Sequence, residues 1–172
     1  MAQSTDVAAG ESATADGTEG IAVPLTVRVI GVGMGAGLLG MIAMLPVLVG
    51  VPVALGVFRT APIAEFVPVV GYFGIEPTFA MGVTVFVAGG TVLWPTLFLV
   101  VGAYLPPKTP RYLRGVSYGT IFWTGFAPAL WPGGGIVTVG TFLIVSLVAH
   151  WIYGGVLAAT LDRTIGIPQH DV

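Results

Sequence analysis

Residues 115–161 read GVSYGTIFWTGFAPALWPGGGIVTVGTFLIVSLVAHWIYGGVLAATL and contain no Asp, Glu, Lys or Arg. Two other stretches, 29–58 and 77–107, are uncharged in the same way, and the three stretches hold 47, 30 and 31 residues. About 20 apolar residues of helix cross a bilayer core that is about 30 Å thick. The longest stretch can therefore hold two membrane spans, and each of the others can hold one.

The composition of the whole chain favours the same class. Only 8% of its 172 residues are charged and 55% are hydrophobic, whereas soluble domains carry about 25% charged residues. A soluble globule of this size could not cover its surface with so few polar groups. The net charge of −2 gives no electrostatic basis for binding nucleic acid. The lack of cysteine excludes disulfides, thiolate metal sites and iron–sulfur clusters.

The sequence predicts an all-α membrane protein, a four-transmembrane-helix bundle between two short tails. Residues 1–22 are acidic and are predicted to be a disordered tail, residues 23–165 form the transmembrane domain, and residues 166–172 are a C-terminal tail. A turn is expected at WPGGG, residues 131–135, because proline and three glycines cannot continue a helix. The expected spans are about 27–55, 79–105, 116–130 and 136–161.

Two features of the first half modify this plan. Pro46 and Pro52 are expected to kink or end the first helix in its outer part. The connector between the first two spans contains IAEFVPVVGYF, residues 63–73, which is apolar but too short to cross a membrane. We expect this segment to lie in the membrane interface.

Lysine and arginine residues predict the orientation, because they are enriched in cytoplasmic loops. With the N-terminus inside, only Arg59 lies on the outer side. The inner side then collects the remaining bases, Arg28, Lys108, Arg111, Arg114 and Arg163. Both termini are therefore predicted to be cytoplasmic in a multi-pass protein of the plasma membrane. Lys108, Arg111 and Arg114 are also candidates for contact with anionic lipids or with another subunit.

A glycine-rich string in the first span, GAGLLG at residues 35–40, matches the GxGxxG dinucleotide fingerprint. That fingerprint requires a strand before it and an acidic residue about 20 residues later. Here the next acid is Glu65, beyond an uninterrupted apolar run, and no βαβ unit follows. Small residues spaced along a helix instead favour close packing of helices in lipid. The candidate packing residues are Gly31, Gly33, Gly35, Gly37 and Gly40.

His150 is the one ionisable residue predicted to lie deep in the membrane, and such residues are functional candidates. We favour a structural hydrogen bond from His150 to a threonine or a backbone carbonyl between helices. Contact with a quinone or lipid headgroup, or ligation of haem, is the alternative. The other histidine, His170, lies in the C-terminal tail, so a haem or quinone site would need a partner subunit.

Four aromatic residues lie at depths similar to that of His150, and they either fill gaps in the bundle or line a cofactor pocket with it. They are Trp94, Tyr118, Trp123 and Trp151. No catalytic residue, metal site or required cofactor is predicted. Threonine and serine hydroxyls within the spans, such as those of Thr120 and Ser146, can link helices.

Several strings along residues 25–165 resemble a known group of proteins. They are IAEFVPVVGYFG, VAGGTVLWPTLFLVVGAYLP, RGVSYGTIFWTGF and SLVAHWIYGGVLAATLD. In these strings the chain resembles small four-helix membrane proteins of haloarchaea that have no assigned function. The resemblance implies a link with respiratory-chain genes, including terminal oxidases.

The sequence leaves three functional hypotheses. The first is a non-catalytic small subunit of a larger membrane complex, respiratory by resemblance, that acts through helix packing. The second is a quinol- or haem-binding electron-transfer protein that uses His150. The third is a small homo-oligomeric channel or carrier. Membrane lipids and other membrane subunits, or copies of the same chain, are the expected partners, and nucleic acid is not.

Overall fold

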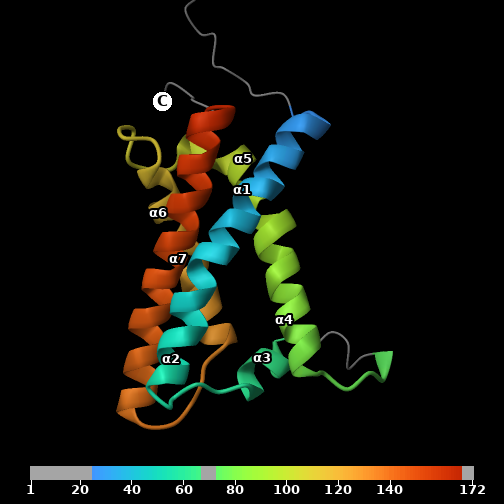
Figure 1. Ribbon diagram of the computed structural model, residues 1–172, viewed down its shortest axis with the longest axis vertical. Helices are drawn as coiled ribbons and strands as arrows, with labels where there is room; N and C mark the ends of the chain where they lie inside the picture. The colour runs from blue at the N-terminus through green and yellow to red at the C-terminus, as the bar shows by residue number, and fades with distance from the viewer. Residues whose placement is uncertain (1–24, 67–72, 168–172) are drawn as a thin grey trace, which may run out of the picture.

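The computed structural model describes residues 25–66 and 73–167, and every regular element within these ranges is helical (Figure 1). The predicted acidic tail, part of the connector and His170 lie outside the described residues. The elements are α1 (Val27–Leu45), η1 (Pro46–Gly50), α2 (Val51–Ala54), α3 (Ala61–Glu65), α4 (Phe79–Ala88), η3 (Gly89–Leu93), α5 (Trp94–Val101), η4 (Gly102–Tyr104), α6 (Leu113–Ala129) and α7 (Ile136–Thr164).

Within the described residues, three continuous helices are long and apolar enough to cross a membrane, as the prediction of a helical membrane protein requires. They are Val27–Ala54, Phe79–Tyr104 and Ile136–Thr164, of 28, 26 and 29 residues. The fourth long helix, α6, has 17 residues and runs beside α7 (Figure 1). The start of α1 and the end of α7 lie at the same end of the molecule.

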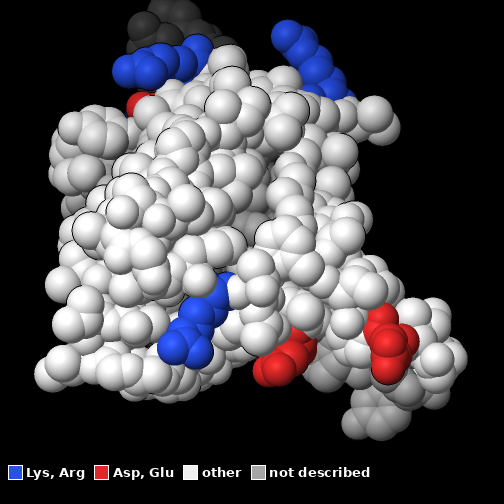
Figure 2. All heavy atoms as spheres, turned by 60° about the horizontal axis from the view of Figure 1, so that its bottom comes forward, with Lys and Arg blue, Asp and Glu red and all other residues white. Residues whose placement is uncertain are grey.

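Charged side chains are separated by a broad uncharged belt. Figure 2 shows lysine and arginine in blue and aspartate and glutamate in red near the two ends, with white surface between them. Large apolar residues are exposed within that belt, including Leu39, Ile42 and Ile144. An exposed apolar belt of this kind is the surface that a bilayer core covers.

The prolines of the first long helix do not end it. Residues Pro46–Gly50 form a π-helical segment, and the chain returns to α-helix from Val51 to Ala54. The same arrangement recurs in the second long helix, where the π-helical segment Gly89–Leu93 precedes Pro95. A π-helical turn changes the hydrogen-bond register, and so a residue without an N–H can be accommodated without breaking the helix.

Close backbone approach joins α6 to α7. A Cβ added at Gly115 would meet the carbonyl of Gly154, and one added at Gly154 would meet the carbonyl of Gly115. A Cβ at Gly119 would meet the carbonyl of His150. Glycine at these three positions therefore allows the two helices to pack backbone against backbone, as small residues do in membrane bundles.

Two tryptophans hold the same pair of helices through reciprocal hydrogen bonds. Trp123 of α6 donates from Nε1 to the Ser146 hydroxyl at 2.9 Å. Trp151 of α7 donates from Nε1 to the Thr120 hydroxyl at 2.8 Å. The Ser146 and Thr120 hydroxyls therefore link the two helices. The tight turn between α6 and α7 contains Gly133 and Gly134, whose φ angles are positive, at 62° and 91°.

Helix α1 crosses the other long helices at part of its glycine set. A Cβ at Gly37 would lie 2.7 Å from the carbonyl oxygen of Gly90, and one at Gly40 would lie 2.8 Å from the Tyr153 ring. Gly33 faces Leu99. By contrast, Cβ atoms added at Gly31 and Gly35 meet no other segment of the described chain within 4 Å, so this second glycine face points outward.

The short helix α3 packs against α4. A Cβ at Gly82 would overlap the carbonyl of Ile63, so the α3 backbone lies directly on the α4 backbone. Figure 1 shows α3 at the end of the molecule where α4 diverges from the other helices. The described part of the connector therefore lies against α4 near this end of the molecule.

Candidate intramembrane binding site

A cavity of about 280 Å³ lies among the long helices at the level of His150. We call it the inner cavity. Its walls come from α1, α4, η3, α5, α6 and α7 together with Phe66, which follows α3. The lining residues are Met41, Met44, Phe66, Phe86, Gly90, Trp94, Phe122, Gly125, Phe126, His150 and Tyr153.

His150 is only 6% exposed. Its Nδ1 lies 2.7 Å from the carbonyl oxygen of Ser146, one turn earlier in α7. A carbonyl oxygen can only accept, so Nδ1 carries the proton and donates it. The favoured prediction of a bond between helices is therefore wrong for this nitrogen, because the bond stays within α7. The ring nitrogen left for a ligand is Nε2.

Aromatic rings surround the histidine and the neighbouring wall. The Phe126 ring lies 4.5 Å from the His150 ring, centroid to centroid. Trp94 and Phe122 are 4.2 Å apart, and Phe122 in turn meets Tyr118 edge-on at 4.3 Å. Aromatic pairs at these separations stabilise one another beyond their burial, so this wall of the cavity is stiffly packed.

Two tyrosine hydroxyls bond to the backbone of the second long helix next to the inner cavity. Tyr153 donates to the carbonyl oxygen of Gly90 at 2.6 Å, and Tyr118 donates to that of Trp94 at 2.5 Å. The proton of each hydroxyl is therefore committed to the backbone. Two side-chain nitrogens of the lining residues are not engaged in a described hydrogen bond, Nε2 of His150 and the indole Nε1 of Trp94. Of the two, only Nε2 of His150 can accept a hydrogen bond, because the indole N–H is a donor.

One lining residue of the inner cavity, Gly125, lies at the molecular surface. This residue lines the cavity and is exposed, and an added Cβ meets no other described segment within 4 Å. Gly125 lies within α6 and not in a loop, so this exposed lining residue is part of a long helix.

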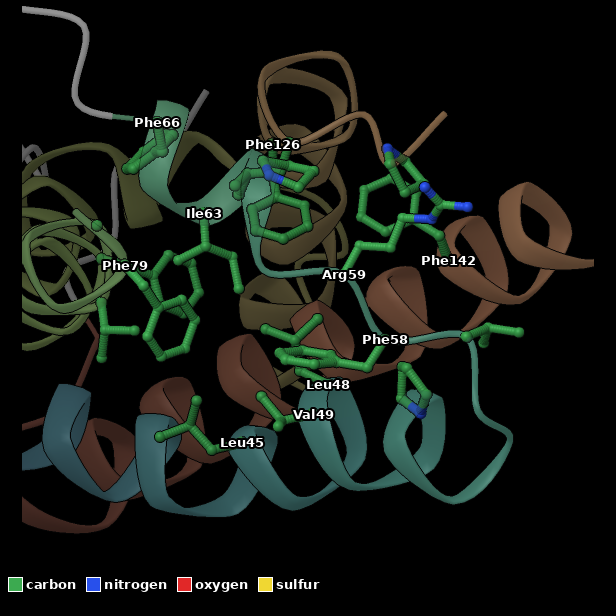
Figure 3. A pocket seen from close by; sticks show the side chains of 18 of the residues that line it. Leu45, Leu48, Val49, Phe58, Arg59, Ile63, Phe66, Phe79, Phe126 and Phe142 are labelled. Carbon is green, nitrogen blue, oxygen red and sulfur yellow. The ribbon is translucent and has the colours of Figure 1, made fainter. Parts of the chain in front are cut away.

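A second cavity of about 340 Å³ lies toward the end of the molecule that carries α2 and α3 (Figure 3). We call it the outer cavity. It shares Phe66, Phe86 and Phe126 with the inner cavity. Figure 3 shows the rings of Phe58, Phe79 and Phe126 around it, with the Arg59 side chain beside Phe142 at its edge.

The structure separates the aromatic residues that the sequence grouped with His150. Trp94 lines the inner cavity with it, and Tyr118 packs behind that wall through Phe122. Trp123 and Trp151 do not line the cavity, because their indole nitrogens bond to Ser146 and Thr120 at the α6–α7 contact.

The basic loop residues fall into two groups. Arg114 is 4% exposed, and its Nε donates to the carbonyl oxygen of Pro107 at 3.1 Å. Its side chain therefore serves the fold at the start of α6. Lys108 and Arg111 are less buried and remain candidates for contact with lipid or another subunit.

Sequence reasoning missed several residues of the site. Tyr153, Phe126 and Gly125 were not singled out, and Arg59 was considered only for orientation. The Gly115–Gly119 pair has the small-xxx-small spacing that is typical of helix contacts, so that signal was present.

Among the described residues no group of three His, Asp or Glu side chains is placed to hold a metal ion.

Comparison with known proteins gives a family and no function. No curated protein and no solved structure matches the chain. The sequence profile of a family described as "Family of unknown function (DUF6789)" matches residues 27–172, which include all the described helices. Because this match covers most of the sequence, the chain belongs to the DUF6789 family.

Proposed function

We propose that the chain is a membrane protein that binds an isoprenoid quinol, with the quinol ring in the inner cavity against His150. The observation that carries this proposal is the environment of His150. It is a buried histidine with one nitrogen committed to the Ser146 carbonyl, and it lines a cavity whose other walls are apolar or aromatic. A few polar groups in a largely apolar pocket are typical of small-molecule sites.

The tautomer of His150 favours the reduced ligand. With the proton on Nδ1, the Nε2 atom of the neutral ring is a hydrogen-bond acceptor. A quinol hydroxyl can donate to such an atom, whereas a quinone carbonyl cannot. The volume of about 280 Å³ is near the lower end of the range for drug-sized ligands, which favours a head of one or two rings over a larger macrocycle.

The exposed position of Gly125 in the cavity lining supports entry from the bilayer. A quinol partitions into the lipid, so a lateral opening at this residue would be a direct route to the inner cavity. In this arrangement the ring enters between α4 and α6 and the prenyl tail stays in the lipid. The rings of Trp94, Phe122 and Phe126 provide apolar contact with the bound ring.

Blocking the proposed opening tests this route. In detergent, decylubiquinol bound next to Trp94 should quench tryptophan fluorescence saturably, and Trp94→Phe should remove most of the quenching. Gly125→Leu should weaken binding at least tenfold, because the added side chain occupies the opening. Gly140→Leu is the matched control, since an added Cβ there also meets no other described segment within 4 Å. Equal binding by the two leucine variants would reject lateral entry at Gly125.

A second candidate function is the role of a small subunit in a larger complex, respiratory by resemblance. The observation that favours it is the outward face of Gly31 and Gly35, which no described segment of this chain covers. A helix of another subunit could approach closely there. The two candidates are compatible, because a quinol-binding subunit can serve a neighbouring oxidoreductase.

The proposed topology has four crossings of the plasma membrane with both ends of the chain in the cytoplasm. It is supported by the common position of the start of α1 and the end of α7 (Figure 1) and by the bases near that end. The 17 residues of α6 extend about 25 Å at 1.5 Å per residue, so its flanking residues would complete that crossing. A reporter fused after Val172 should be cytoplasmic, and an external signal would contradict the topology.

A further inference from the structure

The outer cavity has a different chemistry from the inner one. Its lining is apolar except for the side chains of two residues, Arg59 and Thr138. Lining residues on the first long helix run from Leu45 to Pro52, and those on α4 run from Phe79 to Val87. At 1.5 Å per residue the cavity therefore extends about 10–12 Å along the helices. It is a long apolar space with a cation at one edge.

The position of Arg59 fits a lipid headgroup. Arg59 is exposed and lies where the first long helix has ended. Its Nη2 would be 3.1 Å from a Cβ placed on Gly134, in the turn between α6 and α7. The guanidinium thus lies beside this turn, at the border of the apolar belt, which is the depth at which headgroups lie. The acids Glu65 and Glu76 do not line the cavity.

We propose that the outer cavity is a binding site for one anionic membrane lipid, with an acyl or prenyl chain in the cavity and the phosphate of the headgroup on Arg59. Charge complementarity selects this occupant. An arginine guanidinium binds phosphate oxygens with two parallel hydrogen bonds, and the phenylalanine-lined space takes the chain. The lipid would fill the space between α1, α3 and α4 and hold α3 against the bundle.

Native mass spectrometry of the full chain in mild detergent tests the site. The probes are dioleoylphosphatidylglycerol, which is anionic, and dioleoylphosphatidylcholine, which is zwitterionic. The wild-type chain should retain one phosphatidylglycerol at least tenfold more tightly than phosphatidylcholine. Arg59→Gln should remove that preference, while Arg28→Gln should keep it. Arg28 is the matched control because it is also an exposed arginine and does not line the cavity.

A second pair of variants tests the chain-binding space. Val49→Trp places an indole in the cavity and should reduce retention of both lipids. Val53→Trp, one turn later, is a suitable control because Val53 is 55% exposed and does not line the cavity. Equal retention of the two lipids by the wild-type chain would overturn the proposal. An unchanged preference in Arg59→Gln would overturn it as well.

The lipid site and the proposed quinol site can be tested independently of each other. His150 does not line the outer cavity, so His150→Ala should leave phosphatidylglycerol binding unchanged. Displacement of phosphatidylglycerol by decylubiquinol from His150→Ala would show that the quinol binds in the outer cavity, and would overturn the assignment of the quinol to the inner cavity. Loss of quinol binding in His150→Ala with the lipid preference intact would support both sites.

Discussion

The hydroxyl of Tyr153 in α7 donates a 2.6 Å hydrogen bond to the carbonyl oxygen of Gly90, which lies 63 residues earlier in the chain. The N–H of Trp94 bonds to Gly89, five residues earlier, in the π-helical register. The next donor in that register would be residue 95, which is a proline and has no N–H. Tyr153 thus supplies the hydrogen bond that Pro95 cannot make, and an intramembrane carbonyl is not left unpaired.

Removing this hydroxyl should destabilise the fold. We expect Tyr153→Phe to lower the free energy of unfolding by about 1–2 kcal/mol, because side-chain hydrogen bonds in membranes contribute up to about 1.7 kcal/mol and the Gly90 carbonyl loses its partner. Thermal unfolding in detergent measures the effect. Tyr112→Phe is the control, since Tyr112 is 45% exposed. An equal change in the two variants would contradict the role assigned to Tyr153.

The backbone contact between α6 and α7 should tolerate no side chain. Gly115→Ala and Gly154→Ala each place a methyl group against the opposing carbonyl, and overpacking of this kind costs about 1–3 kcal/mol. Gly140→Ala in α7 should change the stability little, because an added Cβ there has space. Chemical unfolding of the three variants would refute the contact if all of them were equally stable.

The hydrogen bonds of Trp123 and Trp151 should contribute to the stability of the protein but not to ligand binding in the inner cavity. We expect Trp123→Phe and Trp151→Phe to lower stability by about 0.6–1.7 kcal/mol each, because each leaves a hydroxyl without its donor. Neither should change the affinity for decylubiquinol, since neither side chain lines the inner cavity. A loss of quinol affinity without a loss of stability would show that the substituted tryptophan takes part in quinol binding.

Substitutions on the outward face of Gly31 and Gly35 should have an effect only in a complex with another subunit. Gly31→Leu and Gly35→Leu fill a face that no described segment of the chain covers, so the purified chain should stay equally stable. If another subunit docks there, the native mass of the complex extracted from membranes should fall to that of the isolated chain. An unchanged complex in both variants would argue against docking at this face.

The distribution of charged residues predicted much of this architecture, because a charged side chain is costly in the bilayer core. Uncharged stretches located the long helices, and His150 stood out as an ionisable residue among apolar ones. Of the two outcomes expected at Pro46 and Pro52, a helix end or a kink, the helix end is wrong. A helix in lipid cannot leave its backbone exposed, and the chain keeps its helix by passing through a π-helical segment.

The cavities could not be predicted from local patterns. The inner cavity depends on which faces of α1, α6 and α7 meet, and those faces are set by close contacts such as that of Gly119 with the His150 carbonyl. The outer cavity depends on the packing of α3 on Gly82. Arg59 follows the first long helix in sequence, but its place beside Phe142 results from the tertiary arrangement (Figure 3).

In the proposed site, Nε2 of His150 accepts a hydrogen bond from a bound quinol. The most direct test is the dissociation constant of decylubiquinol and of its oxidised form, measured for wild type, His150→Ala and the control Val148→Ala. We predict that wild type and Val148→Ala bind the quinol more tightly than the quinone. His150→Ala should lose about tenfold in quinol affinity, about 1.4 kcal/mol, and the preference with it. Absence of saturable binding by the wild-type chain, or an unchanged quinol preference in His150→Ala, would contradict the claim.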